Sequence, residues 1–463
     1  MTSSNKITWT NYQKTTLALA IISAFLNPFL LSSINVALPS INQDFNLKAI
    51  TLSWIITSFL LSSAIFLLPL GKIADTIGIK KIFSLGIIVF TTTTFLCGFS
   101  FSGHHLIALR FLQGIGGAMT MTTSPAILVS AFSQKHRGRV LGISTSAVYI
   151  GLATGPFIGG FLTQHLGWRS VFFITTVIGI FSIIITLKYL GKDTPTNQKI
   201  NIRPTSVLLY VSALVLLAYG ASIIPKTQGW GLLIGGFVLL ITYILYEKNN
   251  TTPLIDIALF ARNKLFAFSN VAALINYSAT YAIVFILSFY LQKIKLFTPQ
   301  EAGMILLIQP ILMASISPIA GRLSDKIQAR FLSSLGMSFC ALGLFLFSFL
   351  NESSSLVFIA LTLVIVGIGF GFFSSPNMNT IMSSVQKNQY GIASGVSASM
   401  RVLGQIVSMT IVTFFIAYYL GDVNIMEVNN HIFIKTIHVV FMVFGIIASA
   451  GIYFSLARGK LQK

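Results

Sequence analysis

The stretch Gly71-Lys-Ile-Ala-Asp75-Thr-Ile-Gly78-Ile-Lys80-Lys81 lies between two long apolar runs. It places one acid and three lysines within eleven residues, so it predicts a tight polar loop between two helices that cross a membrane. Because the loop is so short, the two helices are expected to be antiparallel neighbours. A related sequence, Gly321-Arg-Leu-Ser-Asp325-Lys326, begins 250 residues later and again lies between apolar runs. The chain therefore carries two copies of one structural unit.

The composition is that of an integral membrane protein. Of the 463 residues, 54% are hydrophobic and only 9% are charged, which leaves too little polar surface to coat a soluble domain. Backbone polar groups inside a bilayer must be paired in helices or in a closed barrel, and the strict alternation of barrel strands is absent. The sequence therefore predicts an all-α membrane protein. It has no phosphate-binding Gly-Lys-Ser/Thr loop and no catalytic constellation, so neither an enzyme nor a cofactor or metal ion is expected.

Apolar runs of the length that crosses a bilayer, about 20 residues each, recur along the whole chain. They predict fourteen transmembrane helices, an even number that places both termini on one side. The start of the chain is too weakly apolar for a secretory signal, so the first span is expected to remain in the protein. The predicted spans are 17–38, 52–70, 82–101, 105–130, 140–163, 170–189, 204–224, 230–247, 265–291, 301–320, 332–350, 355–376, 391–419 and 435–457.

The basic residues set the predicted orientation, because short loops rich in Lys and Arg stay in the cytoplasm. Of the 30 Lys and Arg residues, these spans place 22 on the side of the termini, 6 on the other side and 2 within the membrane. Both termini are therefore expected to be cytoplasmic, in the inner membrane of a bacterium. The net charge of +20 follows from this bias and is spread over short loops, so nucleic acid is not an expected partner.

An internal repeat extends beyond the two polar loops. The offset is 253 residues between Gly114 and Gly367, 251 between Pro125 and Pro376, and 253 between Gly151 and Gly404. Both loops lie on the side of the termini, so the halves point the same way through the membrane. The second loop follows the tenth span rather than the eighth, which indicates two inserted helices. We predict a six-helix bundle over 1–190, a linker with two extra helices over 191–261 and a second six-helix bundle over 262–463.

Four further motifs accompany the opening loop. They are Asn35-Val-Ala-Leu-Pro39, Arg110-Phe-Leu-Gln113-Gly-Ile-Gly116, Gly151-Leu-Ala-Thr-Gly155-Pro156-Phe-Ile-Gly159-Gly160 and Gly391-Ile-Ala-Ser-Gly395, the last of which leads to Arg401 and Gly404. Together with the loop they resemble the motifs of the fourteen-span drug:proton antiporter branch of the major facilitator superfamily, the multidrug efflux type. The resemblance covers most of the amino-terminal half and part of the other half. It implies the major facilitator fold.

The resemblance also implies that the opening loop is part of a gate. Gly71, Asp75, Gly78 and Lys80 match the latch that holds the cytoplasmic side closed in this family. From its position, Asp75 is expected to pair with Arg137 or Arg139 in the next cytoplasmic loop, or to face the N-terminal end of the thirteenth span. In the second copy Gly321 and Asp325 match, but Gln328 stands where a glycine is expected, so that latch is expected to be weaker. The alternative is a solvated loop that only fixes topology.

Small residues recur in the span 140–163. Gly151, Gly155, Gly159 and Gly160 surround Pro156, and small residues four apart let helix backbones approach closely in lipid. By resemblance this segment is the antiporter motif, which is thought to prevent leakage at the interface between the halves. Static packing is the alternative, and the two interpretations overlap.

Two arginines lie inside predicted spans, where a charged side chain is costly. Arg110 and Arg401 should therefore face a wet cavity or an acceptor. By resemblance Arg110 belongs to a proton-relay or substrate site, whereas the structural alternative is that it reaches the outer surface or bonds carbonyls at a span end. Other polar and aromatic residues inside spans are candidates for the cavity lining or for bonds between helices. They are Asn27, Asn35, Gln113, Tyr149, Asn276, Tyr277, Tyr281, Gln309, Asn377, Asn379 and Gln405.

The chain differs from the branch that it resembles in the positions of its acidic residues. None of the ten acids falls at a predicted membrane midplane, and Leu30 stands where members of this branch commonly place an aspartate. A buried carboxylate is the simplest carrier of a proton that moves against the substrate. With two arginines and no acid, the cavity is predicted to be neutral to positive, which suits neutral or anionic amphiphiles better than organic cations.

These observations predict an exporter of amphiphilic small molecules that works by alternating access, as a monomer in the lipid bilayer, with the proton as the coupling ion that the resemblance implies. A second hypothesis is a dedicated exporter or uniporter of an anionic metabolite or siderophore, in which Arg110 and Arg401 would be needed for anions specifically. A third is a membrane sensor that transports nothing, which the two gate loops argue against.

Overall fold

The computed structural model describes residues 9–191, 203–250, 253–254, 257–324, 326–386, 389–421 and 423–459. These residues form helices and contain no β-strand, as predicted for an all-α membrane protein. The elements are α1 (Asn11–Phe45), α2 (Ala49–Ile77), α3 (Ile79–Cys97), α4 (Gly103–Ala131), α5 (Gln134–Leu166), α6 (Arg169–Tyr189), α7 (Pro204–Ser222), α8 (Thr227–Lys248), α9 (Ile257–Arg262), α10 (Lys264–Thr280), α11 (Ile283–Phe289), the π-helix η1 (Tyr290–Ile294), α12 (Pro299–Leu306), α13 (Ile308–Ser324), α14 (Ala329–Phe347), α15 (Leu356–Ser383), α16 (Tyr390–Tyr419) and α17 (Asn430–Ala457).

Within the described chain, thirteen helical segments are long and apolar enough to cross a membrane. α10, α11 and η1 form one such segment, and α12 with α13 forms another. α4 is not among the thirteen, although it has 29 residues and packs against α2 and α3. Its lower apolarity reflects Arg110, Gln113 and a run of glycine and threonine residues. Counting α4, the described chain contains the fourteen predicted spans, and the most polar of them carries the buried arginine.

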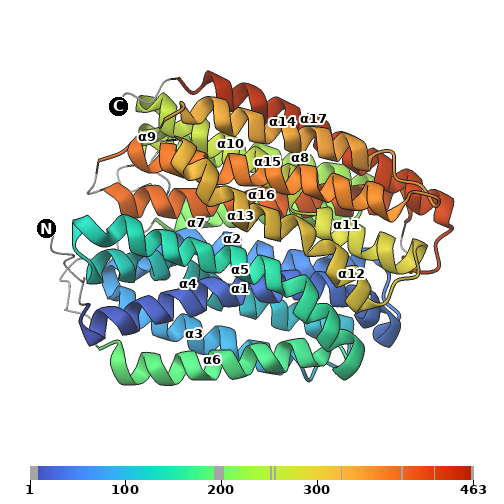
Figure 1. Cartoon of the computed structure of the whole chain (residues 1–463), viewed down its shortest axis with the longest axis horizontal. Coiled ribbons are helices and arrows are strands. Elements are labelled where there is room, and N and C mark those ends of the chain that lie inside the picture. Colours follow the sequence, from blue (N-terminus) through green and yellow to red (C-terminus); the bar gives the residue numbers. More distant parts are fainter. Residues whose placement is uncertain are drawn as a thin grey trace, which may run out of the picture.

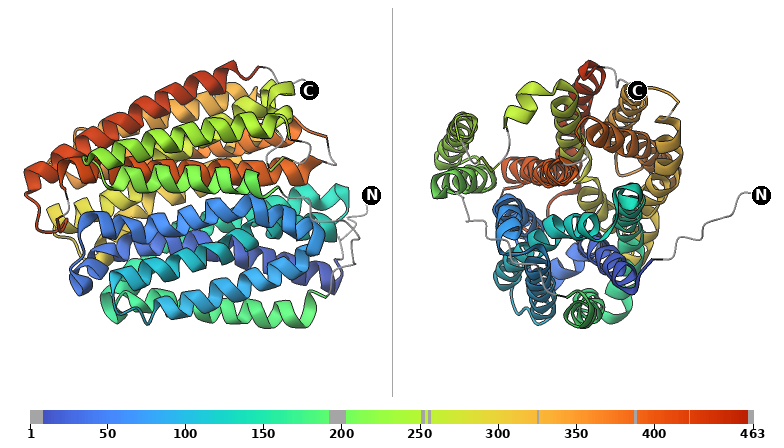
Figure 2. Two further views of the ribbon diagram at one scale, coloured as in Figure 1. Left: turned by 180° about the vertical axis from the view of Figure 1, so that it is seen from behind. Right: turned by 90° about the vertical axis from the view of Figure 1, so that its left-hand side faces the viewer.

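The helices form two bundles side by side (Figures 1 and 2). α1 to α6 pack on one another and are called the first bundle, and α10 to α17 form the second bundle. The bundles meet where α2 packs on α16, α5 on α12 and α13, and α1 on α11. α1 begins and α17 ends at the same end of the molecule, here called the terminus end, and the opposite end is called the outer end (Figure 1).

α7 and α8 form a hairpin at the edge of the molecule, as the right-hand view of Figure 2 shows. The two helices pack on each other, and α7 also contacts α2 and α16. The Tyr210 hydroxyl of α7 donates to the Ala64 carbonyl of α2 at 3.1 Å, and Trp230 of α8 meets Phe414 of α16 edge to face at 5.9 Å. The inserted hairpin therefore contacts both bundles.

The span predicted over 265–291 is broken rather than continuous. α10 ends at Thr280 and α11 begins at Ile283, and the Ala282 N–H donates to the Ser408 hydroxyl of α16 at 3.1 Å. A side chain from a neighbouring helix thus satisfies a backbone group at the break, which permits irregular backbone inside a membrane. The break places Tyr281 at the surface that faces the first bundle.

Candidate functional site

Arg110 of α4 lies wholly inside the first bundle, with 0% of its surface exposed. Its Nε donates to the Ile55 carbonyl of α2 at 3.2 Å, and its Nη1 donates to Gln113 Oε1 one turn along α4. The guanidinium also lies 4.4 Å from the centre of the Phe59 ring. A guanidinium held by a carbonyl, an amide and an aromatic face is fixed in one orientation. It does not extend to the outer surface, but its bond to the Ile55 carbonyl, in the second turn of α2, fits the other arm of the structural alternative, a bond to a carbonyl near a span end.

Gln113 connects this arginine to a third helix. Its Nε2 donates to the Thr94 hydroxyl of α3, so a chain of hydrogen bonds runs from Arg110 through Gln113 to Thr94. Cys97, one turn beyond Thr94, is close enough to interact electrostatically with the guanidinium. The arginine is thus held by α2, α3 and α4 together, and its remaining nitrogen is left for another group.

Arg110 faces the second bundle through Tyr281. The Tyr281 side chain lies beside Asn35 of α1 and close enough to Arg110 for an electrostatic interaction. Within the described chain, the Arg110 Nη2, the Asn35 Oδ1 and the Tyr281 hydroxyl are all buried and lack a hydrogen-bond partner of normal geometry. Buried polar atoms without partners are rare in native proteins and point to a missing water or ligand. We call Arg110, Asn35 and Tyr281 the inter-bundle polar cluster.

A second group of site residues meets nearer the terminus end. The Tyr149 hydroxyl of α5 hydrogen-bonds the Ser374 hydroxyl of α15, across the bundle interface. Arg401 of α16 interacts with both Tyr149 and Tyr277, and the Tyr277 ring meets Phe370 edge to face at 5.4 Å. Three predicted site residues, Tyr149, Tyr277 and Arg401, are therefore brought together from three helices. The group is positive and aromatic.

Other predicted lining residues lie around these two groups or away from them. Asn276 and Gln309 are buried. Asn276 lies beside Cys340, and Gln309 Oε1 finds no partner among the described residues, whereas Gln405 is half-buried one turn beyond Arg401. Asn377 lies elsewhere, because its side chain contacts Ser269 and Arg458 at the terminus end. Nothing in the sequence around Asn377 distinguishes it from the residues that reach the bundle interface.

The predicted gate residues have different partners from those expected. Arg137 donates from Nε to the Val129 and Phe132 carbonyls at 2.9 and 3.2 Å, so it caps the end of α4 rather than pairing with Asp75. Asp75 is exposed and interacts with Lys72 three residues earlier. Asp325 and the side chain of Arg139 lie outside the described residues. The gate role of these residues remains a prediction.

The stretch from Gly71 to Lys81, predicted as a loop, is helical except at Gly78, because α2 continues to Ile77 and α3 begins at Ile79. Gly78 has φ of 122°, a backbone conformation that side chains other than glycine rarely adopt, and it separates α2 from α3. A Cβ on Gly321 would stand 2.6 Å from the Ser375 hydroxyl of α15. Gly71 has more room, with its nearest neighbour, Thr122, 3.8 Å from a Cβ position. Lys80 lies over the Tyr12 ring at 5.0 Å.

Glu247 is an acid whose burial the sequence did not predict. It ends the predicted span 230–247, and in the structure it lies in the last turn of α8 and is 1% exposed. Its carboxylate accepts from the Ser206 hydroxyl, the Asn250 amide and the Leu254 N–H. Lys72 interacts electrostatically with both Glu247 and Asp75. The inserted hairpin is therefore electrostatically connected to the last turns of α2, where Lys72 and Asp75 lie.

The small residues of α5 make two different interfaces. Towards α1, a Cβ on Gly151 would stand 2.6 Å from the Phe25 carbonyl, and one on Gly155 or Gly159 would stand 2.6 or 2.5 Å from the Cβ atom of Ser32 or Ser33. Towards the second bundle, a Cβ on Gly160 would collide with the Pro299 carbonyl at the start of α12. The motif thus lets α5 approach the backbones of both neighbours.

Hydrogen bonds between the bundles gather towards the outer end. The Asn42 amide of α1 donates to Asn424 Oδ1 at 2.6 Å, and Gln292 Nε2 of η1 donates to the Val36 carbonyl at 3.0 Å. Towards the terminus end, the Tyr149–Ser374 bond links the bundles across their interface. The structure is therefore joined most extensively at its outer end.

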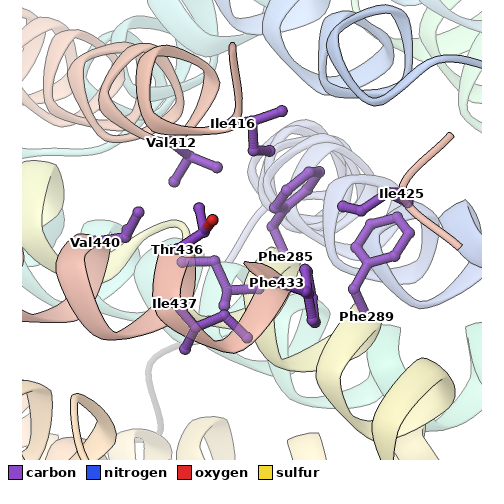
Figure 3. Close-up of a pocket in the computed structure, with 10 residues that line it drawn as sticks. Phe285, Phe289, Val412, Ile416, Ile425, Phe433, Thr436, Ile437 and Val440 are labelled. Carbon is purple, nitrogen blue, oxygen red and sulfur yellow. The ribbon is translucent and has the colours of Figure 1, made fainter. Parts of the chain in front are cut away.

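Two cavities lie outside these groups. One, of about 20 Å³, lies between α11, α16 and α17 and is lined by apolar side chains such as Phe285 and Phe433, with Thr436 as its polar contributor (Figure 3). One hydroxyl is too few for a stable buried water, so this cavity is expected to be dry. The other, of about 290 Å³, lies at the outer end of the first bundle, where Arg169 and Asp44 form an ion pair at 2.8 Å.

Comparison with known proteins assigns this architecture to a family. The family model of the Major Facilitator Superfamily matches residues 20–409 of the chain. The riboflavin transporter RibZ of Clostridioides difficile is 31% identical over 82% of this chain and 83% of its own length. The multidrug resistance protein Stp of Mycobacterium tuberculosis is 28% identical over 84% of this chain and 73% of its own length. The crystal structure of a D-xylose-proton symporter is 11% identical, covers 96% of this chain and 97% of its own, and superposes with a TM-score of 0.67, which supports the fold alone.

Proposed function

The chain belongs to the Major Facilitator Superfamily of membrane transporters, which are not enzymes, and on that premise we propose that it exports amphiphilic small molecules by alternating access in exchange for protons. The observation that carries the proposal is the inter-bundle polar cluster. Asn35 of the first bundle and Tyr281 of the second lie within reach of each other, and beside them the buried Arg110 Nη2 has no partner within the described chain. A substrate bound there contacts both bundles and can couple its own binding to their movement.

We propose that the two bundles, residues 1–190 and 262–463, rock about this cluster while the inserted hairpin follows. The outer contacts between Asn42 and Asn424 and between Gly160 and Pro299 would break when the site opens outward. The contact between Tyr149 and Ser374 would break when the site opens towards the terminus end. In this proposal the terminus end faces the cytoplasm of a bacterium, as the excess of basic residues on that side favours.

The proposed substrates are neutral or anionic molecules with an aromatic part. Arg110 and Arg401 supply positive charge, and Tyr149, Tyr277 and Tyr281 supply aromatic surface with hydroxyl groups. No buried acid faces either arginine among the described residues, so an organic cation would meet unfavourable charge. The similarity to the multidrug resistance protein Stp supports a broad range of substrates.

A second candidate is a carrier dedicated to riboflavin or a similar flat, neutral, polyhydroxylated molecule. The similarity to RibZ, at 31% identity over four-fifths of both chains, favours it. Aromatic rings can stack on a flat ring system, and the free amide and hydroxyl groups can bond a polyol. A dedicated carrier of an anionic metabolite is the corresponding candidate if the arginines bind a carboxylate or phosphate.

The test is purified protein in liposomes with an imposed pH gradient and a panel of one cationic dye, one anionic dye and riboflavin. Export of neutral and anionic molecules that collapses with the gradient would support the proposal. Movement of riboflavin alone would select the dedicated carrier. Gradient-driven export of the cationic dye would contradict the proposed selectivity, and failure of all three to move in sealed vesicles would favour a sensor.

A further inference from the structure

Arg458 is a buried cation at the terminus end of the second bundle, away from the inter-bundle polar cluster. It directly follows α17 and is 2% exposed. Its Nη1 donates to Asn377 Oδ1 of α15 at 2.7 Å and to the Ser269 hydroxyl of α10 at 3.3 Å. Asn377 is held in turn, because its Nδ2 donates to the Ser269 carbonyl at 3.0 Å. These bonds fix the plane of the guanidinium between α10 and α15.

The opposite edge of the same guanidinium has no partner among the described residues. Nε and Nη2 of Arg458 are both buried, and neither has a hydrogen-bond partner within the described ranges. The N–H groups on Nε and Nη2 point in the same direction and form an edge that receives two oxygens of one carboxylate or phosphate group. Because Nη1 is already fixed, this edge is oriented in advance for an anion.

A second arginine adds to the positive charge. Arg330, the second residue of α14, is close enough to repel Arg458 electrostatically, and its own Nε is buried without a partner in the described part of the chain. Burial and the charge of Arg330 lower the pKa of Arg458 to about 10, so the guanidinium remains charged at neutral pH. None of the described acids acts on Arg458. Two adjacent cations with no acid beside them among the described residues are unfavourable unless an anion joins them.

We propose that Arg458 and Arg330 bind the phosphate group of an anionic phospholipid in the leaflet at the terminus end. Both arginines lie at helix ends, where the headgroups of a bilayer would lie. α14 packs along α17, and Phe331, Leu335 and Tyr453 on these two helices are exposed next to the arginines. An acyl chain can lie on this apolar surface while the phosphate reaches the free edge of Arg458, a combination that a soluble anion does not offer.

The test is lipid binding to the full-length protein, purified in detergent and freed of native lipid. Phosphatidylglycerol, phosphatidylcholine and inorganic phosphate are titrated separately, and binding is followed by native mass spectrometry and by the thermal unfolding midpoint. Phosphatidylglycerol should bind and stabilise, and Arg458→Gln and Arg458→Lys should weaken its binding by about tenfold or more, because neither variant offers a bidentate edge. Arg330→Gln should weaken it by less.

Arg322→Gln is the matched control, because Arg322 is an exposed arginine at the same end of the molecule. It should bind phosphatidylglycerol as the unaltered protein does. If Arg458→Gln does not fold, the half-buried Arg330 still provides the test through its own variant. Unchanged lipid affinity in both variants would overturn the proposal, and so would equal stabilisation by inorganic phosphate. The proposal would also be overturned if lipid did not stabilise the unaltered protein and Asp325→Asn unfolded at as low a temperature as Arg458→Gln. That result would favour the Asp325 carboxylate, rather than a lipid phosphate, as the partner of Arg458.

Discussion

Gly303 of α12 and Pro156 of α5 lie in backbone contact across the interface between the two bundles, so close that a Cβ atom on Gly303 would collide with the Pro156 carbonyl. The contact is reciprocal, because a Cβ on Gly160 would collide with the Pro299 carbonyl. α5 and α12 thus approach each other backbone to backbone at the outer end. Such a close contact requires glycine at both positions, and it can exist only while the two bundles touch at the outer end.

Alanine at either glycine should therefore weaken the joined state. Gly303→Ala and Gly160→Ala are each expected to cost about 1–3 kcal/mol in that state through overpacking, and to lower gradient-driven transport by about tenfold. The measurement is dye export from liposomes, with unfolding midpoints recorded beside it. Gly142→Ala in the same α5 is the control, since no atom lies within 4 Å of its Cβ position. Transport at the normal rate in both variants would show that this contact is not part of the cycle.

Arg110 should be required for transport even in its charge-conserving variant. Arg110→Lys keeps the charge but cannot bond both the Ile55 carbonyl and Gln113 Oε1 from one planar group. Losing such a buried interaction costs about 3 kcal/mol, which corresponds to about a hundredfold loss in transport. Export assays with neutral and anionic substrates measure it, with Arg322→Lys as the exposed control. If Arg110→Lys lost only anion transport, the dedicated anion carrier would become the better proposal.

A reversible cross-link at the outer end should arrest the cycle. Asn42 Nδ2 and Asn424 Oδ1 are 2.6 Å apart, so cysteines at both positions should be bridged by a short bifunctional methanethiosulfonate reagent, which spans the gap that the two amide groups fill. The bridge would hold the outer end closed and stop transport, and reduction would restore it. The native Cys97 and Cys340 are both buried, which keeps the background low. Normal transport by the fully cross-linked protein would rule out opening at this end. The two single cysteine variants control for the loss of the Asn42 and Asn424 side-chain amides.

Glu247 should stabilise the inserted hairpin. Its carboxylate accepts hydrogen bonds from Ser206, Asn250 and the Leu254 N–H, and it balances part of the charge of Lys72. Glu247→Gln keeps the size of the side chain but removes the charge, and should cost about 1.5–3 kcal/mol. Thermal unfolding of the detergent-purified protein measures it, and Glu427→Gln, an exposed acid at the outer end, is the control. Equal midpoints for the two variants would mean that the buried charge contributes nothing.

The predictions that needed only local information were the most successful. The length and apolarity of each run predict a membrane helix, because a bilayer imposes one length and one solvent on every crossing. The offset between Gly71 and Gly321 indicates the repeat, since a repeat is itself a property of the sequence. α4 was predicted as a span despite its polarity, because the residues on either side of Arg110 remain apolar. The sequence by itself determined the fold, the number of crossings and the class of protein.

The partners of individual side chains were decided by the tertiary structure. Arg110 donates to the Ile55 carbonyl, 55 residues away, and Tyr149 hydrogen-bonds Ser374 at a separation of 225 residues. Asn377, predicted to line the cavity, instead accepts a hydrogen bond from Arg458. Arg137 caps α4 instead of pairing with Asp75, and Glu247, at the end of the predicted span 230–247, is buried against Ser206. Hydropathy states how deep a residue lies in the membrane but not the direction in which its helix presents it. That direction depends on how each helix is rotated against its neighbours, and only packed coordinates contain this information.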